Sequence, residues 1–188
     1  MRNRHYNNGV GKTRIRDYEA QDAPQLARLF YETVHSVNRA DYSEEQVEAW
    51  APEVPDPKRW HARLLDHRTL VVEKADEVVG FAELEGDGHL DMFYVRKDAV
   101  GRGVGRLLYE ALEREARRQG LERIFTESSI TARPFFERRG FHALREQIVS
   151  RRGVSMMNVA MEKRLGPYYD GEVEQDALHG ESEPAKPA

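Results

Sequence analysis

The stretch RKDAVGRGVGRLL, residues 96–108, carries three glycines at alternate positions, Gly101, Gly103 and Gly105. It follows a run typical of a strand, HLDMFYV, and leads into a run typical of a helix, RLLYEALEREARRQG. Glycine is entropically costly in regular structure, so this density indicates that a ligand approaches the backbone closely. A strand that ends in a glycine-rich turn at a helix N-terminus also presents free N–H groups and the positive end of the helix dipole. The stretch therefore predicts a turn that binds an anion.

Three kinds of phosphate-binding turn compete for this stretch. A P-loop ends in Gly-Lys-Ser/Thr, whereas here Gly105 is followed by Arg106 and Leu107, which excludes a P-loop. A dinucleotide fingerprint requires G-x-G-x-x-G within a βαβ unit. The chain instead has G-x-G-x-G after strands that pattern as antiparallel, so that interpretation is weak. The third hypothesis is a turn for the pyrophosphate of coenzyme A.

The rest of the chain predicts a mixed α/β fold with elements in the order β-α-α-α-β-β-β-α-β-α-β-β. Asp22, Ser43 and Asp56 stand at positions typical of helix N-caps, and Gly120 at a position typical of a helix end. The expected strands are 13–19, 69–74, 78–85, 89–95, 122–128, 141–150 and 154–165. The expected helices are 22–38, 43–51, 56–67, 106–120 and 131–140.

Composition limits the classes of protein to which the chain can belong. One third of its 188 residues are charged, and no apolar run approaches the length of a membrane span. The start, MRNRHYNNGVGK, lacks the apolar stretch of a signal peptide, so we expect a cytoplasmic protein with no membrane partner. Cysteine is absent, which excludes disulfides, thiolate metal ligands and a cysteine nucleophile. We expect no metal.

Charge is unevenly distributed along the chain. From Gly166 onward there are six acidic residues and one Lys, a net charge of −5, which leaves about +1 for the first 165 residues of a chain whose total is −4. Such a tail cannot repay the entropy of ordering. We expect a flexible N-terminus over 1–12, one domain over 13–165 and a disordered, solubilising tail over 166–188. Basic residues elsewhere are scattered, so we expect no nucleic-acid partner.

Two segments resemble the GNAT-type, acetyl-CoA-dependent N-acetyltransferase superfamily. That family's coenzyme motif, Gln/Arg-x-x-Gly-x-Gly/Ala, falls on residues 100–105, and its Ala-x-x-x-Tyr-x-x-x-Gly-Phe block falls on residues 132–141. The resemblance covers about residues 13–165. It implies a single mixed, mostly antiparallel central sheet with a splayed strand pair and helices on both faces.

The resemblance also implies that acetyl-CoA is the co-substrate, with its pantetheine arm inserted between strands 89–95 and 122–128. Main-chain groups of Phe93 and Val95 would pair with the pantetheine amides, and the Val95 N–H would polarise the thioester carbonyl. The implied coenzyme-binding residues are Phe93, Tyr94, Val95, Val100, Gly101, Arg102, Gly103, Val104, Gly105, Arg106, Ser129 and Phe136.

Three positions depart from the family pattern. Val100 stands where Gln or Arg is usual, and Ser129 stands where Asn is common. Phe136 stands where the family often has a Tyr that acts as general acid, and it has no proton to give. A thiol pKa near 8.5 still makes thiolate a tolerable leaving group. Ser128, Ser129, Tyr94 or water could protonate it, and Ser128 and Ser129 are our candidates because they stand at the end of the splayed strand.

Direct attack requires a neutral amine, and at a pKa of about 10.4 only about one amine in 2,000 is neutral at pH 7. A base is therefore needed. The candidates are His89, where some members have a carboxylate, and Asp91, followed by Glu83 and Glu85. Each is alternatively explained as a solvated strand-end or hairpin residue. On a regular strand His89, Asp91 and Phe93 share a face and Tyr94 lies on the opposite one.

We therefore expect an N-acetyltransferase that moves an acetyl group from acetyl-CoA to a primary amine of a small molecule or peptide in a ternary complex. The alternative is a non-catalytic acyl-CoA-binding sensor or partner module, which the absence of Tyr at position 136 favours. Tyr42, Trp50 and Trp60 either wall an acceptor pocket or pack helices onto the sheet. Exposed strand edges make a homodimer plausible.

Overall fold

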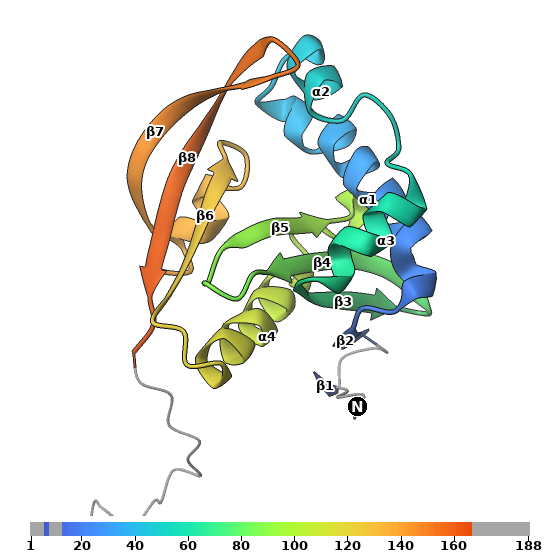
Figure 1. Ribbon diagram of the computed structural model, residues 1–188, viewed down its shortest axis with the longest axis vertical. Helices are drawn as coiled ribbons and strands as arrows, with labels where there is room; N and C mark the ends of the chain where they lie inside the picture. Colours follow the sequence, from blue (N-terminus) through green and yellow to red (C-terminus); the bar gives the residue numbers. More distant parts are fainter. Residues whose placement is uncertain (1–5, 8–12, 167–188) are drawn as a thin grey trace, which may run out of the picture.

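The computed structural model describes residues 6–7 and 13–166, which form two antiparallel sheets (Figure 1). Neighbouring strands of the larger sheet follow one another in the sequence, whereas in the smaller sheet β8 lies between β6 and β7. The larger sheet contains β1 (Tyr6–Asn7), β2 (Thr13–Asp17), β3 (Arg68–Lys74), β4 (Glu77–Leu84) and β5 (Leu90–Val95). The smaller sheet contains β6 (Arg123–Ser129), β7 (His142–Arg151) and β8 (Val154–Arg164).

The two sheets meet where β5 begins beside β6. His89 forms a parallel bridge with Phe125, and the Phe125 N–H donates to the Gly88 carbonyl at 3.0 Å. The Thr126 hydroxyl donates to the Leu90 carbonyl at 2.8 Å. Beyond this junction β5 and β6 diverge (Figure 1). The predicted fold class and its splayed strand pair are confirmed, and the splay divides the expected central sheet into two hydrogen-bonded sheets.

Helices cover both faces of the larger sheet (Figure 1). Strand alternation sends Val71 and Phe81 toward the core beneath α1 and α3, and Leu70 and Ala82 toward the core beneath α4. The helices are α1 (Ala23–Ser36), α2 (Glu44–Trp50), α3 (Pro57–Leu65), α4 (Val104–Arg118) and α5 (Arg133–Glu137), with 3-10 turns η1 (Ala20–Asp22), η2 (Asn38–Ala40) and η3 (Lys97–Ala99).

Helix ends follow the predicted capping residues with one exception. Ser43 and Asp56 accept hydrogen bonds from backbone N–H groups of the first turns of α2 and α3. Asp22 stands at the N-cap position of α1 as predicted, but its side chain makes no capping hydrogen bond. Its carboxylate instead accepts the Glu19 N–H and two hydrogen bonds from the buried guanidinium of Arg16. A buried cation needs its charge balanced, so that ion pair outweighs a cap.

A β-bulge interrupts the pairing of β4 with β5. Glu83 lies opposite Met92 and Leu84 lies opposite Leu90, so Asp91 is an extra residue on β5. An extra residue breaks the strict alternation of side chains along the strand.

The bulge overturns one sequence-based expectation. Asp91 and Phe93 do not share a face, because Asp91 pairs with Arg63 of α3 whereas Phe93 packs into the core beneath α4. Tyr94 packs into the core beneath α1 and α3. Asp91 and Tyr94 therefore lie on the same side of the sheet.

The structure describes only part of the two terminal segments that the sequence predicted. The strand β1 falls within the segment predicted to be flexible, where it pairs with β2. The rest of residues 1–12, and the predicted acidic tail after Gly166, lie outside the described residues. Over the described part of the chain, no helix combines the length and apolar character required to span a bilayer.

Candidate functional site

A cavity of about 550 Å³ occupies the space that the diverging strands β5 and β6 leave between them. The glycine-rich turn, the end of α1 and the segment around α5 complete its wall. Most predicted site residues border this cavity. They are Asp91, Phe93, Tyr94, Val95, Val100, Gly101, Gly103, Gly105, Arg106, Ser128, Ser129 and Phe136.

The backbone of β5 turns donors toward the cavity. Val95 lies opposite Gly80, and the next N–H along β5, that of Arg96, donates to the Val79 carbonyl. In an antiparallel ladder this makes Gly80 and Val95 a non-hydrogen-bonded pair. The N–H groups of Val95 and, two residues earlier, Phe93 therefore point away from β4 and toward the opened side of β5.

The glycine-rich turn lies at the N-terminus of α4. Gly101 and Gly103 have φ values of +75° and +85°, a region that is costly for residues with a Cβ. A Cβ on Gly105 would lie 3.2 Å from the ring of Phe135. The glycines at 101 and 103 thus permit the turn, and the glycine at 105 permits close packing of α4 against α5.

Free N–H groups lie at this helix end. The Leu107 N–H donates to the Gly103 carbonyl, which begins the hydrogen-bond ladder of the helix. The N–H groups of residues 104–106 precede that ladder and have no intrahelical partner. Together with the dipole of a 15-residue helix they form an anion site. Two of the predicted coenzyme-binding residues do not border the cavity: Arg102 is exposed on the turn, and Val104 is buried beneath it.

Aromatic rings close the inner wall of the cavity. Phe136 is 2% exposed, and its ring contacts those of Phe93, Phe135 and Phe141 with centroid separations of 5.1–5.6 Å. Phe136 therefore contributes packing at this position and no proton.

Hydroxyl groups hold the end of β6 to η2 and to the N-cap of α5. The Ser129 hydroxyl accepts the Ala132 N–H at 3.1 Å and lies 3.3 Å from the Asn38 amide nitrogen. The buried Ser128 hydroxyl donates to the Ser129 carbonyl at 3.0 Å. The Tyr42 hydroxyl accepts the N–H of Ile130, which follows β6, and donates to the carbonyl of Met157 in β8. It therefore links β8 to the residue that follows β6.

Asp91 is the candidate base that borders the cavity. Its carboxylate forms an ion pair with Arg63, whose Nε lies 3.4 Å from Oε2 of Glu83. Glu83 is fully buried, and burial raises its pKa even though the charge of Arg63 opposes that shift. Glu83 and Glu85 do not border the cavity.

His89 lies behind the cavity wall at the junction of the sheets. Its ring stacks on Phe125, its Nε2 hydrogen-bonds Oε2 of Glu127 at 2.7 Å, and its Nδ1 lies 3.3 Å from Glu85. Burial lowers the pKa of His89, but the hydrogen bond and charge of Glu127, helped by Glu85, outweigh it and leave the pKa above its usual value. Glu127, which sequence reasoning missed, borders the cavity.

The aromatic residues of the segment 37–66 divide between the two proposed roles. Trp60 is buried and packs against Phe30. Tyr42 is buried too, and its hydroxyl donates to the Met157 carbonyl of β8. Trp50 borders the cavity beside Tyr94. Burial and the nearby Asp91 charge raise the pKa of Tyr94, so its hydroxyl stays protonated at neutral pH.

Other cavity residues also escaped sequence reasoning. Thr33 is a polar residue on the apolar face of α1, and its hydroxyl lies 3.4 Å from the Val95 carbonyl. A buried polar residue in an amphipathic helix was a usable signal for it. Arg138 and Arg139 follow α5, and their position gave no such signal because the surrounding sequence is rich in exposed arginine.

Comparisons with known proteins agree with this geometry. The model of a family described as acetyltransferase (GNAT) domain matches residues 38–165. An uncharacterized N-acetyltransferase of Escherichia coli strain K12, YafP, is 32% identical over 152 residues, which cover 81% of this chain and 96% of that protein.

Solved structures show the same fold. The crystal structure of a GCN5-related N-acetyltransferase from Rhodopseudomonas palustris is 38% identical and has a TM-score of 0.78, covering 85% of this chain and 100% of that chain. The PaiA N-acetyltransferase of Thermoplasma acidophilum, solved with coenzyme A, is 19% identical with a TM-score of 0.68, covering 82% of this chain and 99% of that chain.

Proposed function

Because this chain belongs to the acetyltransferase (GNAT) domain family, we propose that it transfers an acetyl group from acetyl-CoA to a primary amine. The amine attacks the thioester directly while both substrates are bound, and no covalent enzyme intermediate forms. The observation that carries the proposal is one cavity bordered both by the outward N–H groups of β5 and by the N-terminus of α4. An extended arm with amides and a pyrophosphate complements these donors.

The coenzyme residues act mainly through the backbone. The N–H groups of residues 104–106 would hold the pyrophosphate, while Gly101 and Gly103 keep the turn in its left-handed conformation. Phe93 and Val95 would pair with the pantetheine amides as an added strand does. The Val95 N–H would stabilise the oxyanion that forms at the attacked carbonyl, an effect worth roughly 10²–10³ in rate.

Asp91 is the base in this proposal. It borders the cavity, whereas His89, Glu83 and Glu85 do not, and Arg63 holds its carboxylate in place. It takes the proton of the attacking amine directly or through one water. Glu127 of β6 also borders the cavity, and it is a second carboxylate that an acceptor with a positively charged amine would meet there.

The leaving thiolate needs a hydrogen-bond donor on the cavity wall, with water as the final source of the proton. Tyr94 borders the cavity, and its raised pKa keeps its hydroxyl protonated, so it can donate a hydrogen bond to the thiolate. Ser128 and Ser129 also border the cavity, but their hydroxyls are engaged with backbone groups around the end of β6. Tyr94 is therefore the first candidate for the role that Phe136 cannot fill.

The test is thiol release from acetyl-CoA across a panel of small amines and peptides, with steady-state kinetics on Asp91→Asn. General-base loss should lower kcat by roughly 10²–10⁴ while coenzyme affinity changes little. Asp76→Asn is the matched control, because Asp76 lies in an exposed turn and its positive φ of 64° also suits Asn. Tight coenzyme binding without thiol release for any amine would instead support a non-catalytic binding module.

We also propose that the protein forms a homodimer. The outer strand β7 has a free edge in its sheet, and Leu144 and Ile148 on it are 56% and 74% exposed. A long apolar edge favours pairing with a second copy. Sedimentation should find a dimer for the wild type and a monomer for Ile148→Lys, and a monomeric wild type would contradict the pairing.

A further inference from the structure

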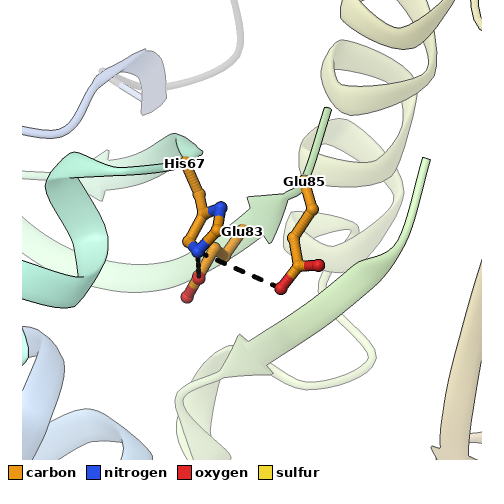
Figure 2. Close-up of side chains that lie close together, drawn as sticks. All are labelled: His67, Glu83 and Glu85. Carbon is orange, nitrogen blue, oxygen red and sulfur yellow. Dashed lines mark ion pairs between the residues drawn. The ribbon is translucent and has the colours of Figure 1, made fainter. Parts of the chain in front are cut away.

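Metal-ligating side chains converge outside the cavity, at the end of β4. Figure 2 shows His67, from the segment between α3 and β3, directed toward Glu83, with Glu85 facing the same imidazole. We propose that His67, Glu83 and Glu85 bind a divalent transition-metal ion such as Zn²⁺. This site does not rest on the proposed acetyl transfer, because its readout is metal binding itself.

The distances suit a shared ion better than direct hydrogen bonds. Nε2 of His67 lies 3.6 Å from Oε1 of Glu83 and 4.0 Å from Oε1 of Glu85, both beyond hydrogen-bond range. One ligand atom from each of the three residues lies within 4.8 Å of the others. Zn²⁺ bonds of about 2.0–2.2 Å in tetrahedral geometry separate ligand atoms by about 3.4 Å. Small side-chain movements would therefore close the site.

Glu83 supplies an independent sign of a missing ligand. Its side chain is fully buried, and its Oε1 has no hydrogen-bond partner among the described residues. That oxygen is the one that faces His67, whereas Oε2 faces Arg63. A buried carboxylate oxygen without a partner is costly, and a cation between Glu83 and His67 would satisfy it.

The donor set favours a first-row transition metal. One imidazole and two carboxylates are ligands that Zn²⁺ accepts, whereas Mg²⁺ prefers oxygen ligands alone. The second oxygen of Glu85 lies 3.3 Å from Nδ1 of His89, which orients the carboxylate as outer partners do in metal sites.

A second set of ligand atoms, from Glu85, His89 and Asp91, overlaps the first. It is a poorer site, because His89 is already hydrogen-bonded to Glu127 and Asp91 is paired with Arg63. The partnerless oxygen of Glu83 places the ion in the first set.

The test is titration of the full chain, without an affinity tag, with Zn²⁺ alone by calorimetry, and with bound metal counted after dialysis. The wild type should bind Zn²⁺ at this site, and Mg²⁺ should compete poorly. His67→Gln and Glu85→Gln should each weaken Zn²⁺ binding by more than the about 10–100-fold that loss of an outer-shell partner costs. Unchanged Zn²⁺ affinity in both variants, or equal affinity for Mg²⁺, would overturn the site.

His142→Gln is the matched control. Nε2 of His142 lies 3.6 Å from Oε1 of Glu162, the same separation as in the proposed site, but on an exposed strand that offers no third ligand. The Zn²⁺ affinity of the His142→Gln variant should equal that of the wild type.

A measurement on the wild-type protein tests the site even if the variants misfold. Glu83 is fully buried, so the mutational test uses His67 and Glu85, whose side chains are 29% and 31% exposed, with circular dichroism as the check of folding. In the wild type, the imidazole NMR signals of His67 should shift on addition of Zn²⁺ while those of His142 stay. A His67 signal that does not respond to Zn²⁺ would contradict the proposal.

Discussion

Arg16 is the clearest case of one residue that organises its surroundings. It is 6% exposed and lies between the carboxylates of Asp22 and Glu73, with Arg14 on the outer side of Glu73. Its hydrogen bonds to Asp22, joined by Glu73, raise the pKa of Arg16 despite its burial. Such a network contributes little compared with apolar packing, but loss of Glu73 leaves N–H groups of the buried Arg16 without their acceptor.

Glu73→Gln tests this network through pH. Burial raises the pKa of Glu73, yet the hydrogen bonds from Arg16 and Arg14 outweigh it and hold that pKa below the ordinary 4.5. The carboxylate therefore stabilises the fold above pH 4.5, and this contribution is lost as pH falls through the lower folded-state pKa. We expect Glu73→Gln to lower the free energy of unfolding by about 1.5–3 kcal/mol at pH 7 in urea, because Arg16 keeps its pair with Asp22, and we expect the difference from the wild type to shrink below pH 4.5. A difference in unfolding free energy between the wild type and the Glu73→Gln variant that does not change with pH would contradict the role of the Glu73 charge.

The three glycines of the turn between β5 and α4 meet two different requirements, one on backbone conformation and one on packing. Its left-handed residues Gly101 and Gly103 lie in open space, so a side chain there meets backbone strain but no steric clash. Gly105 has an ordinary φ and is limited instead by the Phe135 ring. The sequence alone indicated close approach of a ligand, whereas in the structure backbone conformation and packing against α5 account for the three alternate glycines.

Gly103→Glu tests the anion site at this element. The new carboxylate would stand at the N-terminus of α4 and repel a pyrophosphate, so coenzyme A binding should be lost in calorimetry. Gly153→Glu is the control, because Gly153 also has a left-handed φ, +83°, and open space, but lies in the turn between β7 and β8. Equal coenzyme affinity in the two variants would remove the turn from the coenzyme site.

At the scale of the whole molecule, the divergence of the two sheets creates the cavity. The sheets are joined near His89 by a backbone bridge and by the Thr126 hydroxyl, and packing of α4 against β4, β5 and β6 supports the junction. A cavity between strands exposes ladder donors, which a native fold tolerates where a ligand can satisfy them.

Thr126→Val tests the junction between the sheets. Thr126 is buried, and its loss would leave the Leu90 carbonyl without its hydroxyl donor, so the free energy of unfolding should fall by about 1–3 kcal/mol. The hydroxyl of Thr131, by contrast, has no hydrogen-bond partner among the described residues. Thr131→Val should therefore be nearly neutral in the same denaturation experiment, and similar losses in both would argue against the junction bond.

The sequence by itself determined the order of elements, the caps of α2 and α3 and the glycine-rich turn. These features depend on periodicity and on residues close together in the chain, so local pattern suffices to predict them. The resemblance to the GNAT superfamily, and not the local pattern, implied that Phe93 and Val95 lie at the splay.

Only the tertiary structure decided which side chains meet. The bulge at Asp91 changed the faces of β5, and Asp22 turned to Arg16 instead of capping α1. His67 and Glu83 come together although 15 residues separate them in the chain. Strand register and long-range ion pairs are fixed by the packing of distant segments, where buried charge must find a partner, and no local pattern encodes that choice.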